Sequence, residues 1–469
     1  MGENKKLPFS VKFGYGIGAL SYGIPFQLVA GFFVFYTSAI LRLSGTLVGL
    51  IMSVSIIWDA VTDPVMGYIS DHTKKNIVLG RRLFYVLLGA AGLAVCNYFM
   101  WSIDPRLPES QKVLLIGIFI VLIKTFSTVI TTPYLALGAE LSTDYAERNS
   151  VQSFRTAFFF LGYLFPAVIG MALFFRPTAD YPNGQLNPEA YSSLGLAASG
   201  IVLACAIACI FSTYKRGAIP AIQKTKKSGA ANMFKETAQA LRCADFRNIS
   251  IGLLFINTAM GIVGAVGMHV FTFTFDFTSK QIAVVFGSLF MMALVAQPFW
   301  VAIANRYEKR KALIACLYLN IAVSALFLAL VILNAWVAEN YLFVLPAALL
   351  MGLSMGGSIS LPYSMISDTI DKEAFYSGAR KEGVFYGCAT FMFKLSQSVA
   401  VLFTGFLLDI IRFDSEIVQT PDVYLKLGLI LPGGFLICFV AALIFVKKYT
   451  LDRQAVAAYQ RGIERARII

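Results

Sequence analysis

The sequence predicts an all-α integral membrane protein with twelve transmembrane helices in two pseudo-symmetric six-helix bundles. Three observations predict this class. Hydrophobic residues make up 58% of the 469 residues and charged residues only 14%, with a mean hydropathy of +0.71. This is far more apolar than a soluble protein of similar length. Apolar runs long enough to span a bilayer recur twelve times, and landmarks of the first half of the chain return in the second.

The predicted spans are separated by short polar segments and by one long basic segment in the middle of the chain. They cover residues 13–41, 45–70, 83–103, 113–139, 152–175, 190–213, 248–275, 281–304, 312–336, 341–367, 384–410 and 425–446. Lysine and arginine gather in alternate connections, so the positive-inside rule predicts a multi-pass protein of the cytoplasmic (inner) membrane with both termini in the cytoplasm. The net charge of +13 therefore reports topology, and we expect no nucleic-acid partner.

Span two (45–70) carries a pair of acids, Asp59 and Asp63. Their spacing of one helical turn puts both carboxylates on one face. An ionised carboxylate inside a span costs roughly 2.5–3.5 kcal/mol, so a partner or a function must offset it. Converging oxygen ligands suit a hard monovalent cation or a shared proton. The alternative is an interhelical ion pair with a basic residue elsewhere in the bundle.

Three further polar residues inside predicted spans are candidates for substrate contact or coupling. Lys124, midway along span four, is expected to contact an anionic substrate such as a uronate, or else to snorkel or to form a structural pair. Lys394, well inside span eleven, needs a carboxylate, a cavity or a ligand, and the span-two acids are its natural partners. The alternative is a salt bridge that holds the two halves together. Gln27 of span one can recognise a hydroxyl or merely bridge helices.

An internal repeat predicts the domain organisation. Asp71 at the end of span two returns as Asn305 at the end of span eight, and Pro133 of span four returns as Pro362 of span ten. Both pairs are separated by close to half the chain length, which predicts two six-helix halves with a substrate site between them. The predicted parts are a bundle at 1–214, a cytoplasmic linker at 215–246, a bundle at 247–447 and a cytoplasmic tail at 448–469.

Several motifs together resemble one known family. A short loop signature of the major facilitator superfamily is present as Gly67, Asp71, Gly80, Arg81 and Arg82. Further matches are residues 59–67, residues 133–141, Glu147-Arg148 with Arg155, Asp368 with Asp371, and Lys394. In combination, over nearly the whole chain, they resemble the glycoside–pentoside–hexuronide:cation symporter family, typified by melibiose permease.

The resemblance implies a coupling-cation site in the first half of the chain. The family's acidic pair corresponds to Asp59 and Asp63, and Thr128 completes the site. Thr62 stands where the melibiose permease has an asparagine, so one oxygen donor is altered. The family's basic residues near the substrate and cation pockets correspond to Arg155 and Lys394. The implied coupling ion is Na⁺ or H⁺, with no cofactor and no other metal.

The resemblance also bears on the gate and on the substrate. We expect a cytoplasmic gate set, which consists of Asp71, Arg81, Arg82, Glu140 and Asp368. The permease's two galactoside-binding acids correspond to Gly23 and Thr131 here, so that site is absent in that form, and Thr131 stays only a candidate substrate contact. A branch with lysophosphatidylcholine substrates also lacks these acids, which makes an amphipathic substrate the alternative.

These observations separate three classes of function. The sequence has no phosphate-cradling Walker loop for a primary pump and, with two histidines, little material for an enzyme's active site. The twin halves and the buried acids speak against a non-transporting sensor, which remains the alternative from a different class. We expect a monomeric, cation-coupled secondary symporter of a sugar, glycoside or uronate, working by alternating access.

Overall fold

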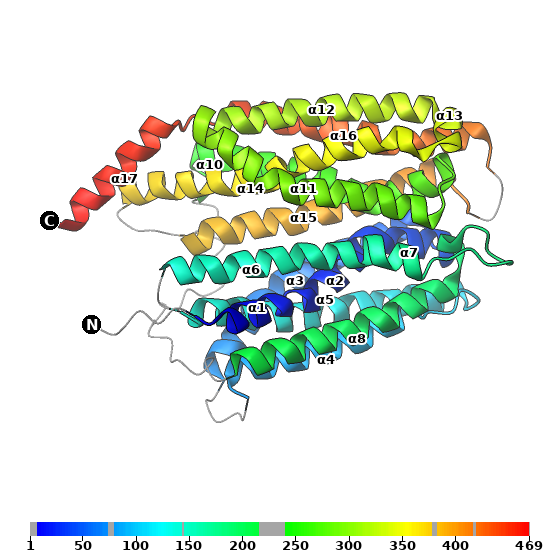
Figure 1. The fold of residues 1–469 in the computed structure, drawn as a ribbon, viewed down its shortest axis with the longest axis horizontal. Helices are drawn as coiled ribbons and strands as arrows, with labels where there is room; N and C mark the ends of the chain where they lie inside the picture. Colours follow the sequence, from blue (N-terminus) through cyan, green and yellow to red (C-terminus); the bar gives the residue numbers. More distant parts are fainter. Residues whose placement is uncertain are drawn as a thin grey trace. The chain divides into compact units, whose positions relative to one another are not determined.

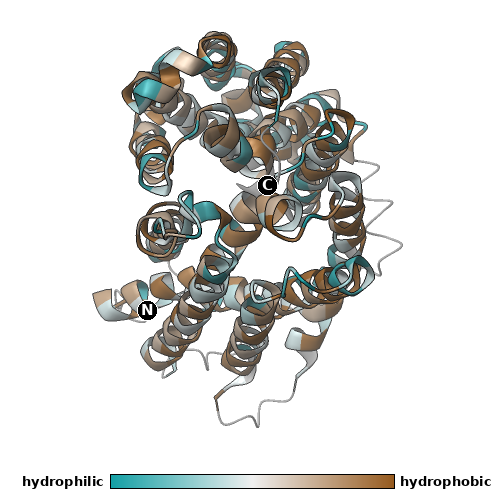
Figure 2. Ribbon diagram, turned by 90° about the vertical axis from the view of Figure 1, so that its right-hand side faces the viewer, coloured by the Kyte–Doolittle hydropathy of each residue, from teal (hydrophilic) through white to brown (hydrophobic). Residues whose placement is uncertain are grey.

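The computed structural model describes residues 7–73, 79–142, 145–214, 240–377, 382–415 and 419–468, and these residues form helices joined by turns and short connections (Figure 1). Twelve helical segments among them are long and apolar enough to cross a membrane. Their ribbons are mostly hydrophobic, with hydrophilic residues on many of the connections (Figure 2). The predicted fold class is confirmed, and each predicted span falls on a helix.

The chain divides into two compact units, the first of which comprises Met1–Thr225 with the short segments Thr278–Ala283 and Asp414–Glu416. Its main helices are α1 (Phe9–Gly18), α2 (Leu20–Phe35), α3 (Gly45–His72), α4 (Arg81–Met100), α5 (Glu109–Glu140), α6 (Tyr145–Leu164), α7 (Met171–Leu173) and α8 (Pro188–Thr213). Two π-helical segments, Tyr36–Ile40 and Phe165–Gly170, continue α2 and α6, and a 3₁₀ turn, Gly184–Leu186, precedes α8. These elements supply six spans.

The second unit comprises the remaining residues and supplies the other six spans. Its helices are α10 (Ala244–His269), most of α11 (Ser279–Tyr307), α12 (Lys309–Ile332), α13 (Asn334–Glu339), α14 (Leu345–Ser377), α15 (Glu382–Ile410), α16 (Pro421–Lys447) and α17 (Arg453–Ile468). A π-helical segment, Val270–Thr274, ends the α10 span, and a 3₁₀ turn, Tyr341–Val344, precedes α14. Residues 215–239 of the predicted linker lie outside the described residues.

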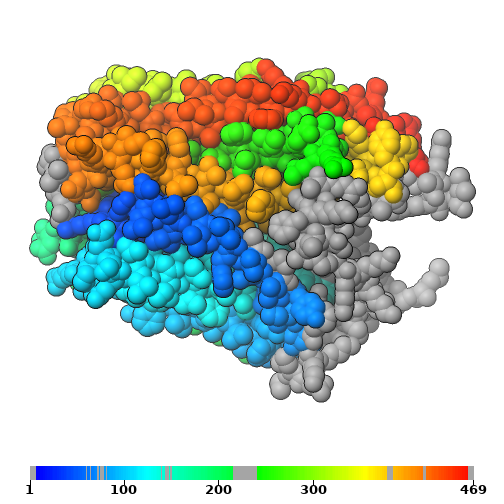
Figure 3. Space-filling model, turned by 180° about the vertical axis from the view of Figure 1, so that it is seen from behind, coloured from blue at the N-terminus to red at the C-terminus, as the bar shows by residue number. Residues whose placement is uncertain are grey.

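In the first unit α5 packs against both α3 and α4, and α8 packs against α4 and α1. Side chains of the N-terminal spans (blue to cyan) fill the space between neighbouring helices on the face drawn in Figure 3. Two reciprocal hydrogen bonds fix α5 on α1. The hydroxyl of Tyr15 donates to the carbonyl oxygen of Tyr134, and the hydroxyl of Tyr134 donates to the carbonyl oxygen of Tyr15. The two rings stack with their centroids 4.5 Å apart. Because both residues are fully buried, this pair satisfies polar groups that lipid or packed side chains cannot.

In the second unit α11 and α14 approach closely because glycine lines the contact. A Cβ atom on Gly352 would lie 2.3 Å from the carbonyl oxygen of Leu289. The indole nitrogen of Trp300 on α11 donates to the carbonyl oxygen of Leu353 on α14 at 2.7 Å. Small residues that allow backbones to approach are the usual means of packing spans in lipid, where no hydrophobic force drives helices together.

The helix α14 continues beyond position 367, the predicted end of span ten, and ends at Ser377. Apolar patterning stops at 367 because charged residues begin there. The helix continues because these charges find partners within the second unit: Lys309 lies 2.6 Å from Asp368, and Lys372 lies 2.7 Å from Asp245 at the start of α10. The nitrogen of Gln460 on α17 donates to Asp371 at 2.7 Å.

Candidate functional site

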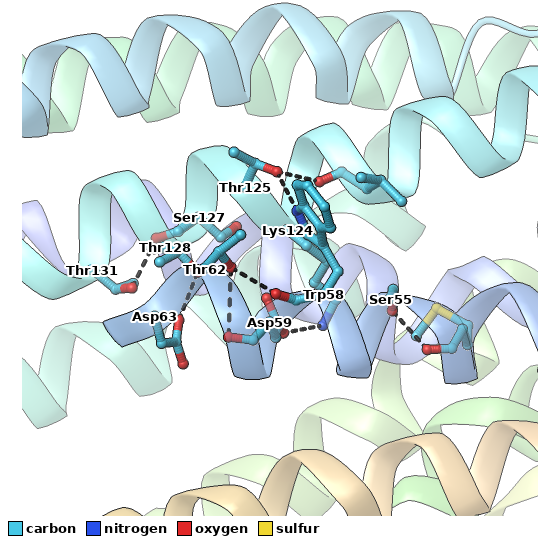
Figure 4. A network of polar contacts seen from close by, with 12 residues as sticks. Ser55, Trp58, Asp59, Thr62, Asp63, Lys124, Thr125, Ser127, Thr128 and Thr131 are labelled. Carbon is cyan, nitrogen blue, oxygen red and sulfur yellow. Dashed lines mark hydrogen bonds and ion pairs between the residues drawn. The ribbon is translucent and has the colours of Figure 1, made fainter. Parts of the chain in front are cut away.

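The acidic residues of α3 face the polar residues of α5 in register. The hydroxyl of Thr128 donates to Oδ1 of Asp63 at 2.8 Å, and Nζ of Lys124 lies 3.5 Å from Oδ2 of Asp59 (Figure 4). The two pairs have the same separation in sequence (128 minus 63 and 124 minus 59). Since the two members on each helix are one turn apart, one helical turn of α3 lies along one helical turn of α5.

Burial differs between the four side chains of this site. The side chain of Asp59 is 5% exposed and that of Lys124 is 21% exposed. Thr128 is buried, and Asp63 is partly buried. The carboxylates therefore lie in a largely desolvated setting, where a cation, a proton or an ammonium group must compensate their charge.

Two neighbouring residues that the sequence analysis did not single out fix the register of the helices. The indole nitrogen of Trp58 donates to the hydroxyl of Thr125 at 2.8 Å, and that hydroxyl donates to the carbonyl oxygen of Val121 at 2.8 Å. Trp58 and Thr125 directly adjoin Asp59 and Lys124 in sequence. Their place beside Asp59 and Lys124 was the signal that the sequence offered, whereas the register itself comes only from the structure.

Thr62 lies on α3 between the two acids. Its hydroxyl donates to the carbonyl oxygen of Trp58 at 3.1 Å and approaches that of Asp59 at 3.5 Å. The hydroxyl is therefore held against its own helix (Figure 4). Its oxygen keeps acceptor capacity, because a hydroxyl that donates one hydrogen bond still has lone pairs.

The roles of the other predicted substrate residues stay predictions. Thr131 donates to the carbonyl oxygen of Ser127 on its own helix at 2.8 Å, and Gln27 is buried on α2. Arg155 is a partly buried residue of α6. Lys394 is a partly buried residue of α15 in the second unit, and its pairing with Asp59 or Asp63 stays a prediction.

Gly23, one of the two positions that correspond to the galactoside-binding acids, packs tightly against α6. A Cβ atom there would lie 3.1 Å from the carbonyl oxygen of Phe159 and 3.6 Å from Cα of Gly162. A side chain at position 23 would press on the backbone of α6. A side chain at this position would therefore require α6 to shift by a few tenths of an ångström.

Three members of the predicted gate set, Arg82, Glu140 and Asp368, form ion pairs at equivalent places in the repeat. Arg82 of α4 lies 3.0 Å from Glu140 of α5, and its guanidinium also donates to the hydroxyl of Ser70 on α3. Lys309 of α12 lies 2.6 Å from Asp368 of α14. The separation of the two cations in sequence (309 minus 82) nearly equals that of the two acids (368 minus 140).

These separations agree with that between Pro133 and Pro362 (362 minus 133), both of which lie inside helices. The ion pairs therefore belong to the same repeat as the prolines. Asp71 and Arg81, the other members of the gate set, lie on α3 and α4, and their side chains fall outside the part of the chain that the structure describes.

The donor set of the α3–α5 site defines what it can bind. It offers carboxylate and hydroxyl oxygens and one ammonium group, with no thiolate or imidazole in the contacts described above. Oxygen donors suit a hard cation such as Na⁺, and paired carboxylates can also share a proton. The ammonium of Lys124 can contact an anion.

Comparison with known proteins places the chain among transporters. The model of the family described as MFS/sugar transport protein matches residues 14–453. The chain is 24% identical over 460 residues to the inner membrane symporter YicJ of Escherichia coli, covering 95% of this chain and 93% of the relative. It is 22% identical over 480 residues to the sodium-dependent lysophosphatidylcholine symporter 1-B of Danio rerio, covering 96% and 88%.

A solved structure shares the fold. The nucleoside transporter NupG has a TM-score of 0.66 at 12% identity, with 94% of this chain and 100% of that chain covered. At this identity the likeness concerns the fold alone. The relatives and the solved structure are transporters rather than enzymes.

Proposed function

Because the chain belongs to the MFS/sugar transport protein family, we propose that this multi-pass membrane transporter is a symporter coupled to Na⁺ or H⁺. The proposed substrate is a sugar, glycoside or uronate, and transport follows alternating access between the two halves. The observation that carries the proposal is the register of α3 and α5, which gathers Asp59, Asp63 and Thr128 in a largely buried place.

The proposed coupling works through charge. A cation bound by the carboxylates of Asp59 and Asp63 and the hydroxyl of Thr128 offsets buried negative charge. If cation binding raises substrate affinity, linkage requires substrate to raise cation affinity by the same factor. Substrate and ion then cross together, and a gradient of one drives the other.

A second substrate class has its own support. A relative with 22% identity is named a sodium-dependent lysophosphatidylcholine symporter, and this chain has a tightly packed glycine at position 23, where the melibiose permease has a galactoside-binding acid. An amphipathic lipid is therefore the alternative substrate. Transport of such a lipid would use the same cation site, because the proposed cation ligands on α3 are the same whichever substrate is carried.

The test uses the purified full-length protein in lipid nanodiscs. Its thermal midpoint is measured with a hexose, a disaccharide, glucuronate or lysophosphatidylcholine, each in NaCl and in choline chloride at two pH values. A bound ligand stabilises by mass action, so a shift that needs both cation and compound identifies the pair. Asp63→Asn should abolish the cation-dependent shift. If that variant keeps it in full, the proposed cation site is wrong.

We further propose that both termini face the cytoplasm and that the protein acts as a monomer in the inner membrane. Alternating lysine and arginine content of the connections supports this orientation. Fusion of a fluorescent protein or of alkaline phosphatase to the C-terminus tests it. Phosphatase activity in intact cells would contradict a cytoplasmic C-terminus.

A further inference from the structure

We propose that Lys124 is an internal counter-ion of the cation site. When the coupling cation binds, the ammonium group of Lys124 leaves Asp59 and pairs with an anionic group of the substrate. This inference rests on the proposed function and names the substrate class of the same site. The anionic group is a carboxylate or a phosphate, as a uronate or a lysophospholipid carries.

The first step is the position of the ammonium group. Nζ of Lys124 lies 3.5 Å from Oδ2 of Asp59, on the helix that also carries Thr128 (Figure 4). A coupling cation that uses Asp59 as a ligand would therefore lie close to the Lys124 ammonium. Two cations at that separation repel each other in a buried setting, so the cation and Lys124 compete for the same carboxylate.

The second step is the looseness of this ion pair. Other partly buried lysine pairs of the chain are shorter: Lys12 lies 2.8 Å from Glu147, and Lys372 lies 2.7 Å from Asp245. Lys124 is also the more accessible member of its pair, with 21% of its side chain exposed against 5% for Asp59. The lysine stem is flexible, whereas the hydrogen bond from Trp58 to Thr125 fixes the helices. The ammonium group is thus the part that can move.

The third step is the charge of the displaced lysine. If a cation takes Asp59, Lys124 becomes a charge inside a span without that counter-ion, and such a charge is strongly disfavoured. An anionic group of the substrate supplies the missing partner, whereas a neutral sugar does not. Substrate and cation then favour each other's binding, because each removes the charge that the other would leave uncompensated.

The experiment measures the NaCl concentration that gives half of the Na⁺-dependent thermal shift, with choline chloride holding ionic strength constant. In the wild type, choline glucuronate should lower this concentration about tenfold, which is about 1.4 kcal/mol of coupling, while glucose leaves it unchanged. Lysophosphatidylcholine is compared with monoacylglycerol in the same way. The arm that responds identifies carboxylate or phosphate as the source of the anion.

Two variants of Lys124 should shift the half-saturating NaCl concentration in opposite directions. Lys124→Gln should lower the half-saturating NaCl at least tenfold without any anion and lose the response to glucuronate or lysophosphatidylcholine, because no ammonium competes. Lys124→Arg should raise the half-saturating NaCl concentration, since a guanidinium group binds a carboxylate through two hydrogen bonds and competes better with the cation. Lys12→Gln, which breaks another ion pair of the same unit, is the matched control and should behave as wild type.

The outcomes separate this inference from the proposed function. Suppose that Asp63→Asn abolishes the Na⁺ response but Lys124→Gln changes neither the half-saturating NaCl concentration nor the response to the anion. Lys124 is then only a structural partner, and this inference fails while the proposed function stands. A neutral compound that matches its anionic counterpart would also overturn it. If Asp63→Asn keeps the Na⁺ response, the cation site itself is misassigned. Where Lys124→Gln does not fold, the Lys124→Arg shift decides.

Discussion

Nζ of Lys124 lies 3.5 Å from Oδ2 of Asp59, on two neighbouring spans of one six-helix unit. This contact changes the expected electrostatics of the acid pair. The sequence offered a lysine of the other half, Lys394, as the natural counter-charge, whereas the structure places one within the same unit. The charge of α3 is thus partly compensated from α5 before any ligand takes part.

The hydroxyl of Thr128 should matter for cation affinity more than for folding. Thr128→Val keeps the shape of the side chain but removes the donor to Asp63 and one oxygen ligand. A net hydrogen bond contributes about 0.5–1.5 kcal/mol, so the half-saturating Na⁺ concentration should rise about tenfold. Thr128→Ser keeps the oxygen and should retain the affinity. Sodium titration of the thermal midpoint checks both, and equal affinity of the valine and serine variants would exclude Thr128 as a ligand.

The pair of Arg82 and Glu140 should stabilise the first unit strongly. Their side chains are only 7% and 10% exposed, so Arg82→Ala leaves a buried carboxylate without its partner. Breaking such a pair costs about 3–5 kcal/mol, whereas replacing both members by apolar residues is often neutral. Unfolding midpoints should therefore fall in Arg82→Ala and recover in the double variant Arg82→Met with Glu140→Leu. Additive losses in the double variant would contradict a direct pair.

The contact of α11 with α14 should not tolerate a methyl group. In Gly352→Ala the new Cβ atom would lie 2.3 Å from the carbonyl oxygen of Leu289, so the helices must separate. Overpacking of this kind typically costs about 1–3 kcal/mol. Gly387→Ala on α15 is the matched control, since no atom lies within 4 Å of its Cβ position. The thermal midpoints of the two variants are compared. An equal change in both would show that α11 and α14 can separate at little cost in free energy.

The helix α17 should protect the end of α14 from solvent exchange. The ring of Tyr459 lies 5.3 Å from that of Phe375 and 5.9 Å from that of Tyr376. Tyr459→Ala removes these contacts, so amide hydrogen exchange across residues 371–377 should speed up, because local opening becomes easier. Gln454→Ala, at an exposed position of the same helix, serves as the control. Unchanged exchange in Tyr459→Ala would mean that α17 does not brace α14.

The sequence by itself determined the class of the protein and the number of its spans. A long uninterrupted apolar run can satisfy its backbone in lipid only as a helix, so composition and length fix the element. The internal repeat could also be detected from the sequence, because matching residues such as Pro133 and Pro362 are separated by a nearly constant number of positions. The acid pair on α3 stood out because a charge inside a span is costly wherever it lies.

Apart from Thr128, which the family resemblance had placed at the site, only the tertiary structure decided which residues meet those acids. Spacing along one helix says which side chains share a face, but it does not say which neighbouring helix that face contacts or in what register. The tertiary structure was therefore needed to find three contacts. These are Lys124 beside Asp59, the hydrogen bond from Trp58 to Thr125, and the tight packing of Gly23 against α6. The extension of α14 to Ser377 has the same cause, because its charges are stabilised by partners on other helices.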